Sequence, residues 1–270
     1  MMKVTRVPIE IAVLSLVLLT GCGSSTAAQA ATASAAAQGQ GAQGCDIFVE
    51  CEDDTAAPEG ESSASADGLH SSSPASFKEA YESLNGKETS SGKVYRAVAI
   101  PDDNPMIEIS GDEAASMLQK GETFYLYIGD EQCPWCRSVI EQALASAKKH
   151  GIHTIYYVQI WDADHNEVLR DRYELQDGKA VQTGFGTGAY SVLLQAADAF
   201  LDEYTLEDEN GNEVDTGEKR IYAPTFFKVN KGSVTAMTTG TSPAQSDAYQ
   251  PLDDTILADE ASMMDTFFSK

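Results

Sequence analysis

The chain has 270 residues, with 18 Lys and Arg against 42 Asp and Glu, and a formal net charge of -24. So large an acidic excess argues against a nucleic-acid-binding protein and against electrostatic attachment to a membrane surface. The solubility of an exported protein accounts for this acidity, which by itself names no partner.

The amino terminus has the pattern of a secretory signal. A short cationic start precedes an apolar stretch, residues 11–19, that is too short to span a membrane as a helix. The stretch leads into the tetrapeptide LTGC at positions 19–22, which resembles the lipobox of bacterial lipoproteins, where the cysteine is lipidated and becomes the mature N-terminus. We expect residues 1–21 to be a signal peptide and Cys22 to carry the lipid. The alternative is an ordinary signal peptide that contains a cysteine.

Residues 22–75 are a predicted tether. After Cys22 the segment is dominated by Ala, Ser, Gly and Gln, and aromatic and branched side chains are scarce. Such a segment buries too little apolar surface to offset its ordering entropy, so we expect it to be disordered. It would hold the folded part, residues 76–270, away from the extracytoplasmic face of the cell membrane.

Two cysteines of the tether, Cys45 and Cys51, admit three interpretations. They could form a local disulfide, since disulfides persist outside the cytoplasm. They could be a mobile second dithiol that exchanges with Cys133. They could also be free or intermolecular thiols.

The first predicted elements of the folded part are short. Residues 77–84 form an amphipathic helix candidate, and residues 93–100 (KVYRAVAI) a strand candidate. Residues 106–109 are a second extended piece. Ser110 and Glu113 have the spacing of a capping box, which predicts a helix from there through Leu118.

A buried strand and a second helix flank the most informative motif of the chain. Residues 123–128 are nearly all apolar or aromatic and predict the strand, and apolar residues at helical spacing up to about residue 147 predict the helix. Between them lies Cys133-Pro134-Trp135-Cys136. The first cysteine would sit at a helix N-terminus, where unpaired amides and the helix dipole favour a thiolate.

The clearest strand of the chain, residues 153–161, follows this helix. The segment after it, about 162–222, holds a hairpin candidate with its turn at Asp177-Gly178 and a helix candidate whose apolar face runs from Tyr190 to Tyr204. A second hairpin candidate has its turn at Asn210-Gly211.

A further hairpin and a closing helix complete the chain. Residues 225–229 and 234–238 predict the hairpin, and apolar residues at helical spacing between 257 and 268 predict the helix. Alternating strands and helices followed by a hairpin and a helix imply an α/β fold with a mixed sheet and helices on both faces.

This order, with CPWC at the head of a helix, resembles the thioredoxin fold. Ala223-Pro224-Thr225 supports the resemblance, because thioredoxin-like proteins carry a cis-proline that faces the dithiol. The spacing of the motifs is similar to that of bacterial thioredoxin-like proteins of the bacteriocin transport accessory type. The resemblance covers residues 76–270, with residues 162–222 as an insertion between the third core strand and the cis-proline strand.

The chain departs from thioredoxin at one position. Thioredoxin has a buried Asp six residues before its first motif cysteine, where this chain has Tyr127. Asp130 and Glu131 lie nearer to the motif, but in a loop, so the proton-relay role of the thioredoxin Asp does not carry over to either.

The motif predicts thiol–disulfide exchange without a cofactor or a metal. Cys133 would be the partly exposed attacking sulfur and Cys136 the buried resolving one, with Pro134 in the first helical turn and Trp135 beside the sulfur. Ala223, Pro224 and Thr225 would line the other side of the site. A static disulfide and a zinc site are the alternatives, but a zinc site would need two further ligands.

The sequence therefore predicts a lipid-anchored, extracytoplasmic thiol–disulfide oxidoreductase. Its partners would be the membrane, through the lipid on Cys22, and an exported thiol or disulfide protein or peptide. The competing hypothesis is a non-catalytic binding module of the same fold that holds an exported peptide, such as a bacteriocin. The direction of electron flow and the redox partner are left open.

Overall fold

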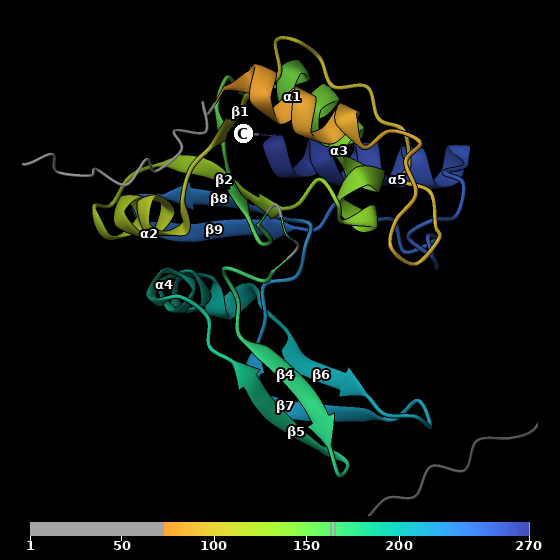
Figure 1. Cartoon of the computed structure of the whole chain (residues 1–270). Helices are drawn as coiled ribbons and strands as arrows, with labels where there is room; N and C mark the ends of the chain where they lie inside the picture. The colour runs from red at the N-terminus through yellow and green to blue at the C-terminus, as the bar shows by residue number, and fades with distance from the viewer. Residues whose placement is uncertain (1–72, 163, 165, 270) are drawn as a thin grey trace, which may run out of the picture. The chain divides into compact units, whose positions relative to one another are not determined.

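A five-stranded mixed sheet lies at the centre of the part of the chain that the structure describes (Figure 1). This computed structural model describes residues 73–162, 164 and 166–269. The strand order is β1-β3-β2-β8-β9, and the strands are β1 Met106–Glu108, β2 Phe124–Gly129, β3 Ile155–Gln159, β8 Thr225–Asn230 and β9 Ser233–Thr238. β1 and β2 run parallel to β3, while β8 runs antiparallel to both β2 and β9. The parallel pairs need helical crossovers, and the hairpin does not.

Three helices cover one face of this sheet (Figure 1). They are α1 (Pro74–Ser83), α3 (Pro134–Lys149) and α5 (Asp254–Phe268). Buried side chains of these helices pack with Tyr127 of β2 in a single apolar cluster that also contains both motif cysteines. The dithiol is therefore attached to the main core rather than to a peripheral loop.

Two helices cover the opposite face. They are α2 (Gly111–Gln119) and α4 (Gly188–Ala197), which pack against each other. Leu126 and Ile128 of β2 point to this side and join its cluster, since neighbouring strand residues alternate between faces. The fold is thus the expected α/β class, a thioredoxin-like mixed sheet between helical layers. Helix α4, within the segment 162–222, is part of the layer that covers the sheet.

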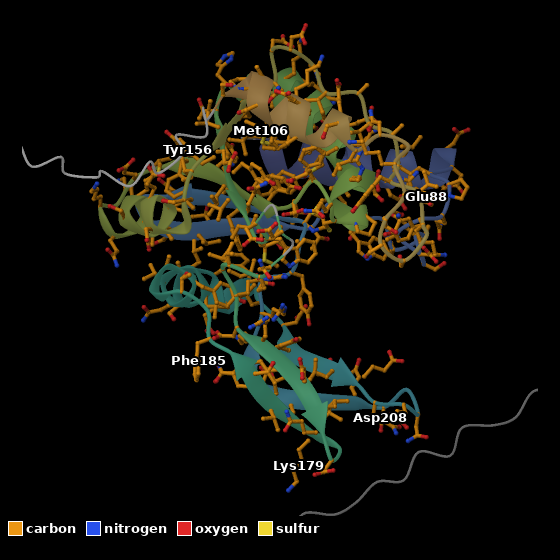
Figure 2. All side chains as sticks on the ribbon, viewed as in Figure 1. Glu88, Met106, Tyr156, Lys179, Phe185 and Asp208 are labelled. Carbon is orange, nitrogen blue, oxygen red and sulfur yellow. The ribbon has the colours of Figure 1, made fainter. Side chains whose placement is uncertain are left out.

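Two hairpins flank helix α4 in the sequence. They are β4 (Arg172–Gln176) with β5 (Lys179–Gly184), and β6 (Glu203–Glu207) with β7 (Glu213–Lys219). Both predicted turns are confirmed, and Asp177 adopts a positive φ of 52° at the first of them. Lys179 and Asp208 mark the ends of the two hairpins in Figure 2.

The predicted helix from Tyr190 to Tyr204 is too long. The α-helix ends at Ala197, a 3₁₀ turn follows over Asp198–Phe200, and Tyr204 belongs to strand β6. Tyr204 continues the helical spacing in the sequence, but its ring packs in the hairpin region. It contacts the ring of Tyr173 in β4 edge to face, at a centroid distance of 5.7 Å.

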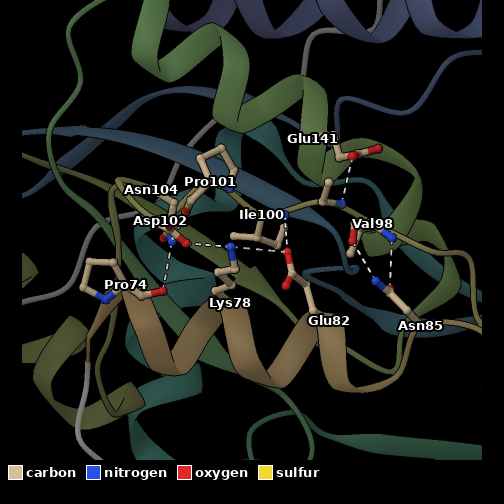
Figure 3. A network of polar contacts seen from close by, with 11 residues as sticks. Pro74, Lys78, Glu82, Asn85, Val98, Ile100, Pro101, Asp102, Asn104 and Glu141 are labelled. Carbon is tan, nitrogen blue, oxygen red and sulfur yellow. Dashed lines mark hydrogen bonds and ion pairs between the residues drawn. The ribbon is translucent and has the colours of Figure 1, made fainter.

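The predicted strand over residues 93–100 is wrong. The segment contains no strand, although Val94 makes an isolated bridge with Glu88 and Tyr95 N–H donates to the carbonyl of Lys87 at 2.9 Å. The backbone amides of residues 98–100 bond to side chains instead of to a neighbouring strand (Figure 3). Val98 N–H donates to Asn85 Oδ1 at 3.0 Å, and Ile100 N–H donates to Glu82 Oε1 at 2.8 Å. Ala99 N–H donates to Glu141 Oε1 at 2.9 Å. Polar side chains of α1, α3 and the loop after α1 therefore accept the backbone N–H groups at the end of this β-like segment.

The remaining elements agree with their predictions. Ser110 and Glu113 form the capping box at the start of α2, with each residue's side chain accepting from the other's backbone N–H. Among the described residues, no helix is long and apolar enough to cross a membrane. The predicted signal peptide, the lipidated Cys22, the pair Cys45 and Cys51, and the predicted tether up to residue 72 lie outside the described residues. The last residues assigned to the tether, 73–75, instead form the N-cap and first turn of α1, because the side chain of Ser73 accepts the backbone N–H of Ser76.

Candidate active site

Cys133 is the N-cap residue of helix α3. Its Sγ accepts the backbone N–H of Cys136 at 3.3 Å, which satisfies one of the unpaired amides of the first turn. Pro134 follows at the first helical position, where its missing N–H leaves no backbone partner unsatisfied. The amide donors that surround the sulfur thus come from its own helix, independently of tertiary contacts.

The two sulfurs have opposite electrostatic environments. The Cys136 thiol, the backbone amides of Cys136 and Trp135, and the Arg170 guanidinium together hold the pKa of Cys133 below its ordinary 9.0, although burial opposes them. Burial raises the pKa of Cys136 well above 9.0, and the neighbouring Cys133 adds to the shift. Cys133 is therefore the sulfur that ionises first, and Cys136 is the thiol that stays protonated.

The loop before β8 forms the other wall of the site. The peptide bond between Ala223 and Pro224 is cis, and Thr225 Oγ1 donates to the carbonyl of Tyr222 at 2.6 Å, across this turn. The thiol of Cys133 donates to the carbonyl of Ala223 at 3.7 Å.

Cys133 is more buried than the sequence indicates. Only 5% of it is exposed, whereas a partly exposed sulfur is expected at a helix start. The physical reason is the loop at Ala223, whose carbonyl lies against the sulfur. Cys136 is fully buried, as expected, and Trp135 is half-buried against the same core.

Tyr127 occupies the place of the thioredoxin Asp, and it is completely buried beside Cys136. Its ring stacks on Tyr157 and Phe226 at centroid distances of 5.2 and 4.5 Å. Its hydroxyl shares a 2.8 Å hydrogen bond with the hydroxyl of Tyr81 from α1. Contact with Tyr127 lowers the pKa of the Cys136 thiol and thereby offsets part of its burial, so a neutral hydroxyl stands where a carboxyl is usual.

Asp130 is the acidic group of the site that sequence reasoning set aside. It follows β2 directly, is 0% exposed, and accepts the backbone N–H of Gln132 at 2.8 Å. Burial, then the charges of Glu131 and Cys133, raise the pKa of Asp130 from 3.8 to about 8. Its position at the end of a buried strand, three residues before the first motif cysteine, was the available signal.

Arg137 connects the segments that surround the motif through hydrogen bonds of its guanidinium. The guanidinium donates to the carbonyls of Arg96, Tyr81 and Glu131 at 2.8, 3.0 and 2.9 Å, and to Asn85 Oδ1 at 2.6 Å. The side chain is fully buried. It therefore ties α1, the extended segment and the loop before the motif to the first turn of α3, a role that no sequence pattern marked.

The structure brings the predicted site residues together from two distant parts of the chain. Cys133 of the motif and Ala223 of the loop are in contact at the Cys133 sulfur, and Pro224 and Thr225 follow Ala223 directly in the sequence. The described residues contain no group of three or more His, Cys, Asp or Glu side chains that could hold a metal ion.

Comparison with known proteins adds little to this geometry. No family model matches the chain, and no curated protein matches it. Among solved structures, thioredoxin O2 from Arabidopsis thaliana in its oxidized state aligns with 13% identity and a TM-score of 0.29, over 62% of this chain and 96% of that one. The sheet order, the helical layers and the contact of Cys133 with the residue before the cis-proline define a thioredoxin-like fold.

Proposed function

We propose that this protein is a thiol–disulfide oxidoreductase that works through Cys133 and Cys136. The observation that carries the proposal is the asymmetry of the two sulfurs at the start of α3. Cys133 caps the helix and has a lowered pKa, whereas Cys136 is fully buried and has a raised one. A static disulfide or a zinc site would need no such division.

In the reducing direction, the Cys133 thiolate attacks one sulfur of a substrate disulfide. A Cys133–substrate disulfide forms, the substrate S–S bond breaks, and one substrate thiolate leaves with its electron pair. Cys136 loses its proton and attacks Cys133 Sγ, which releases the second substrate thiolate. The substrate gains two electrons and the dithiol loses two. The two substrate thiols receive one proton from Cys136 and one from solvent, which equals the proton that Cys133 released when it ionised. The reverse sequence oxidises a substrate dithiol.

Two groups of the site support the second step. Deprotonation of Cys136 is the demanding part, because its burial disfavours the thiolate. Tyr127 lowers the pKa of that thiol. Asp130, with a pKa of about 8, can accept a proton only when it is ionised, and the ionised fraction grows as the pH rises toward 8.

The test is reduction of insulin by dithiothreitol with the full chain and with Cys133→Ser and Cys136→Ser. The wild type should accelerate precipitation of insulin, and Cys133→Ser should not. Cys136→Ser should accumulate a mixed disulfide on Cys133, detectable by mass spectrometry. Unchanged activity of Cys133→Ser would overturn the proposal.

We further propose that the protein acts at the extracytoplasmic face of the cell membrane, anchored by a lipid on Cys22. The support is the LTGC tetrapeptide and the low-complexity tether in the sequence. Labelling of cells with an alkyne fatty acid should mark the wild type and not Cys22→Ala, and the variant should leave the membrane fraction. A labelled Cys22→Ala protein would contradict the anchor.

The substrate class that fits this location is an exported protein or peptide with cysteines, as the similarity to the bacteriocin transport accessory type implies. A binding module of the same fold would hold such a peptide without redox chemistry. Titration against glutathione buffers separates the two functions. An oxidoreductase gives a reversible two-electron couple at Cys133 and Cys136, and a binding module gives peptide affinity that persists in Cys133→Ser.

A further inference from the structure

Three charged side chains with little solvent exposure lie next to the loop that contains the cis-proline. Arg170 Nη2 and Nε donate to Glu167 Oε2 at 2.6 and 3.0 Å, and Arg220 Nη2 lies 3.8 Å from the same oxygen. The side chains of Arg170 and Glu167 are each 7% exposed, and that of Arg220 is 11% exposed. Two guanidinium groups thus share one carboxylate, which leaves a net charge of +1 in a region of low dielectric.

This cluster is attached to the loop that touches Cys133. Arg170 Nη1 donates to the carbonyl of Ile221 at 3.4 Å, and Ile221 lies two residues before Ala223. The carbonyl of Ala223 in turn accepts from the Cys133 thiol at 3.7 Å. Arg220 Nη1 donates to the carbonyl of Asp171 at 2.7 Å, which connects Arg220 to the segment between β3 and β4. The positive charge is therefore fixed by backbone contacts and does not move freely.

We propose that Arg170, held by Glu167 and Arg220, is a positioning residue that stabilises the Cys133 thiolate by its charge and sets the pH range in which the dithiol reacts. The inference rests on the proposed oxidoreductase function and extends it to residues outside the motif. The attraction between Arg170 and the Cys133 sulfur acts in the direction that lowers the pKa of this thiol.

Other titratable groups near the sulfur set the background for this effect. Asp130 comes from the loop before α3, and Cys136 comes from α3 itself. Asp130 is largely protonated below pH 8, so it adds little negative charge at neutral pH.

The test uses two substitutions with opposite electrostatic signs. Reduced full-length protein is alkylated with iodoacetamide between pH 4 and pH 9, and the rate at Cys133 is followed by site-resolved mass spectrometry. Arg170→Gln removes the positive charge, so its rate profile should move to higher pH, with alkylation about two- to tenfold slower at pH 6. Glu167→Gln removes the negative charge, so its profile should move to lower pH. Arg170→Lys keeps the charge and should stay closer to wild type than Arg170→Gln does.

Lys219→Gln is the matched control. It removes a cation adjacent in sequence to Arg220, but one that is 30% exposed and pairs with Asp198, so the Cys133 profile should not move. Far-UV circular dichroism of each variant checks that it folds. Loss of packing would move Arg170→Gln and Glu167→Gln in the same direction, whereas the proposal requires opposite directions.

The outcomes separate this inference from the proposed function. Profiles of Arg170→Gln and Glu167→Gln that coincide with wild type, or that move together, overturn the role of Arg170 while insulin reduction stays intact. A wild-type Cys133 that is alkylated no faster than an ordinary thiol, together with absent insulin reduction, overturns the oxidoreductase itself.

Discussion

Asp130→Asn should stabilise the protein at pH 8 and have little effect at pH 4. The carboxyl of Asp130 is 0% exposed, and its pKa lies near 8 in the folded chain against 3.8 ordinarily. Between these values the folded state holds a proton that the unfolded state has released. The free energy of unfolding of the wild type therefore falls as pH rises through this window. Asparagine can keep the 2.8 Å bond from Gln132 N–H and cannot ionise.

The magnitude follows from the proton linkage. Each pH unit between the two pKa values corresponds to about 1.4 kcal/mol for one proton, so the interval from pH 5 to pH 8 gives at most about 4 kcal/mol. Rearrangement of water and side chains around the ionised carboxylate relieves part of this cost. We therefore expect the wild type to lose about 2–4 kcal/mol relative to Asp130→Asn over this interval.

Urea unfolding followed by far-UV circular dichroism at pH 5, 6, 7 and 8, with a phosphine reductant, measures the difference. Cys133 contributes a slope of opposite sign, since its pKa is lowered, so the comparison is repeated with Cys133→Ala in both proteins. Glu260, whose pKa is raised by burial to about 7, contributes equally to both and cancels. Glu79→Gln removes an exposed carboxylate and serves as the control. A constant difference between wild type and Asp130→Asn at all four pH values would refute the reasoning.

Three further substitutions test the packing around the sulfurs. Tyr127→Phe removes the hydroxyl that bonds to Tyr81 at 2.8 Å and that lowers the pKa of Cys136 in the wild type. The substitution should cost about 1–2 kcal/mol in urea unfolding. It should also prolong the mixed disulfide on Cys133, which quenched-flow mass analysis measures. Gly129→Ala would place its methyl carbon in steric overlap with Tyr127 Oη, so urea unfolding should show a loss of about 1–3 kcal/mol, and equal stability would contradict the contact. Arg137→Met keeps the buried volume but leaves its carbonyl acceptors unpaired, so the thermal midpoint should fall with a loss of about 3 kcal/mol.

Local patterns in the sequence were enough for most of the helices and strands. The capping box at Ser110, the turn residues at 177–178 and 210–211, and the period of apolar residues each act within one element. Such signals depend on neighbours along the chain, so they survive without knowledge of the fold. The same holds for Cys133, because the amides of its own helix reach its sulfur.

Predictions failed where distant groups compete with a local preference. Residues 93–100 have strand-forming side chains, but beyond an isolated bridge at Val94 the side chains of Asn85, Glu82 and Glu141 pair with the backbone amides of residues 98–100 in place of a strand. Tyr204 continued a helical spacing yet packs in a hairpin.

The chemistry of the site divides in the same way. The sequence by itself determined the dithiol and its order on the helix, because these are fixed by residue type and spacing, whereas a cis-proline facing the dithiol was implied by the resemblance to thioredoxin-like proteins. Only the tertiary structure decided that Cys133 is 5% exposed, that Asp130 is fully buried, and that Arg170 stands behind the cis-proline loop. Burial and charge depend on which segments fold over a group, and those segments lie far from the motif in the sequence.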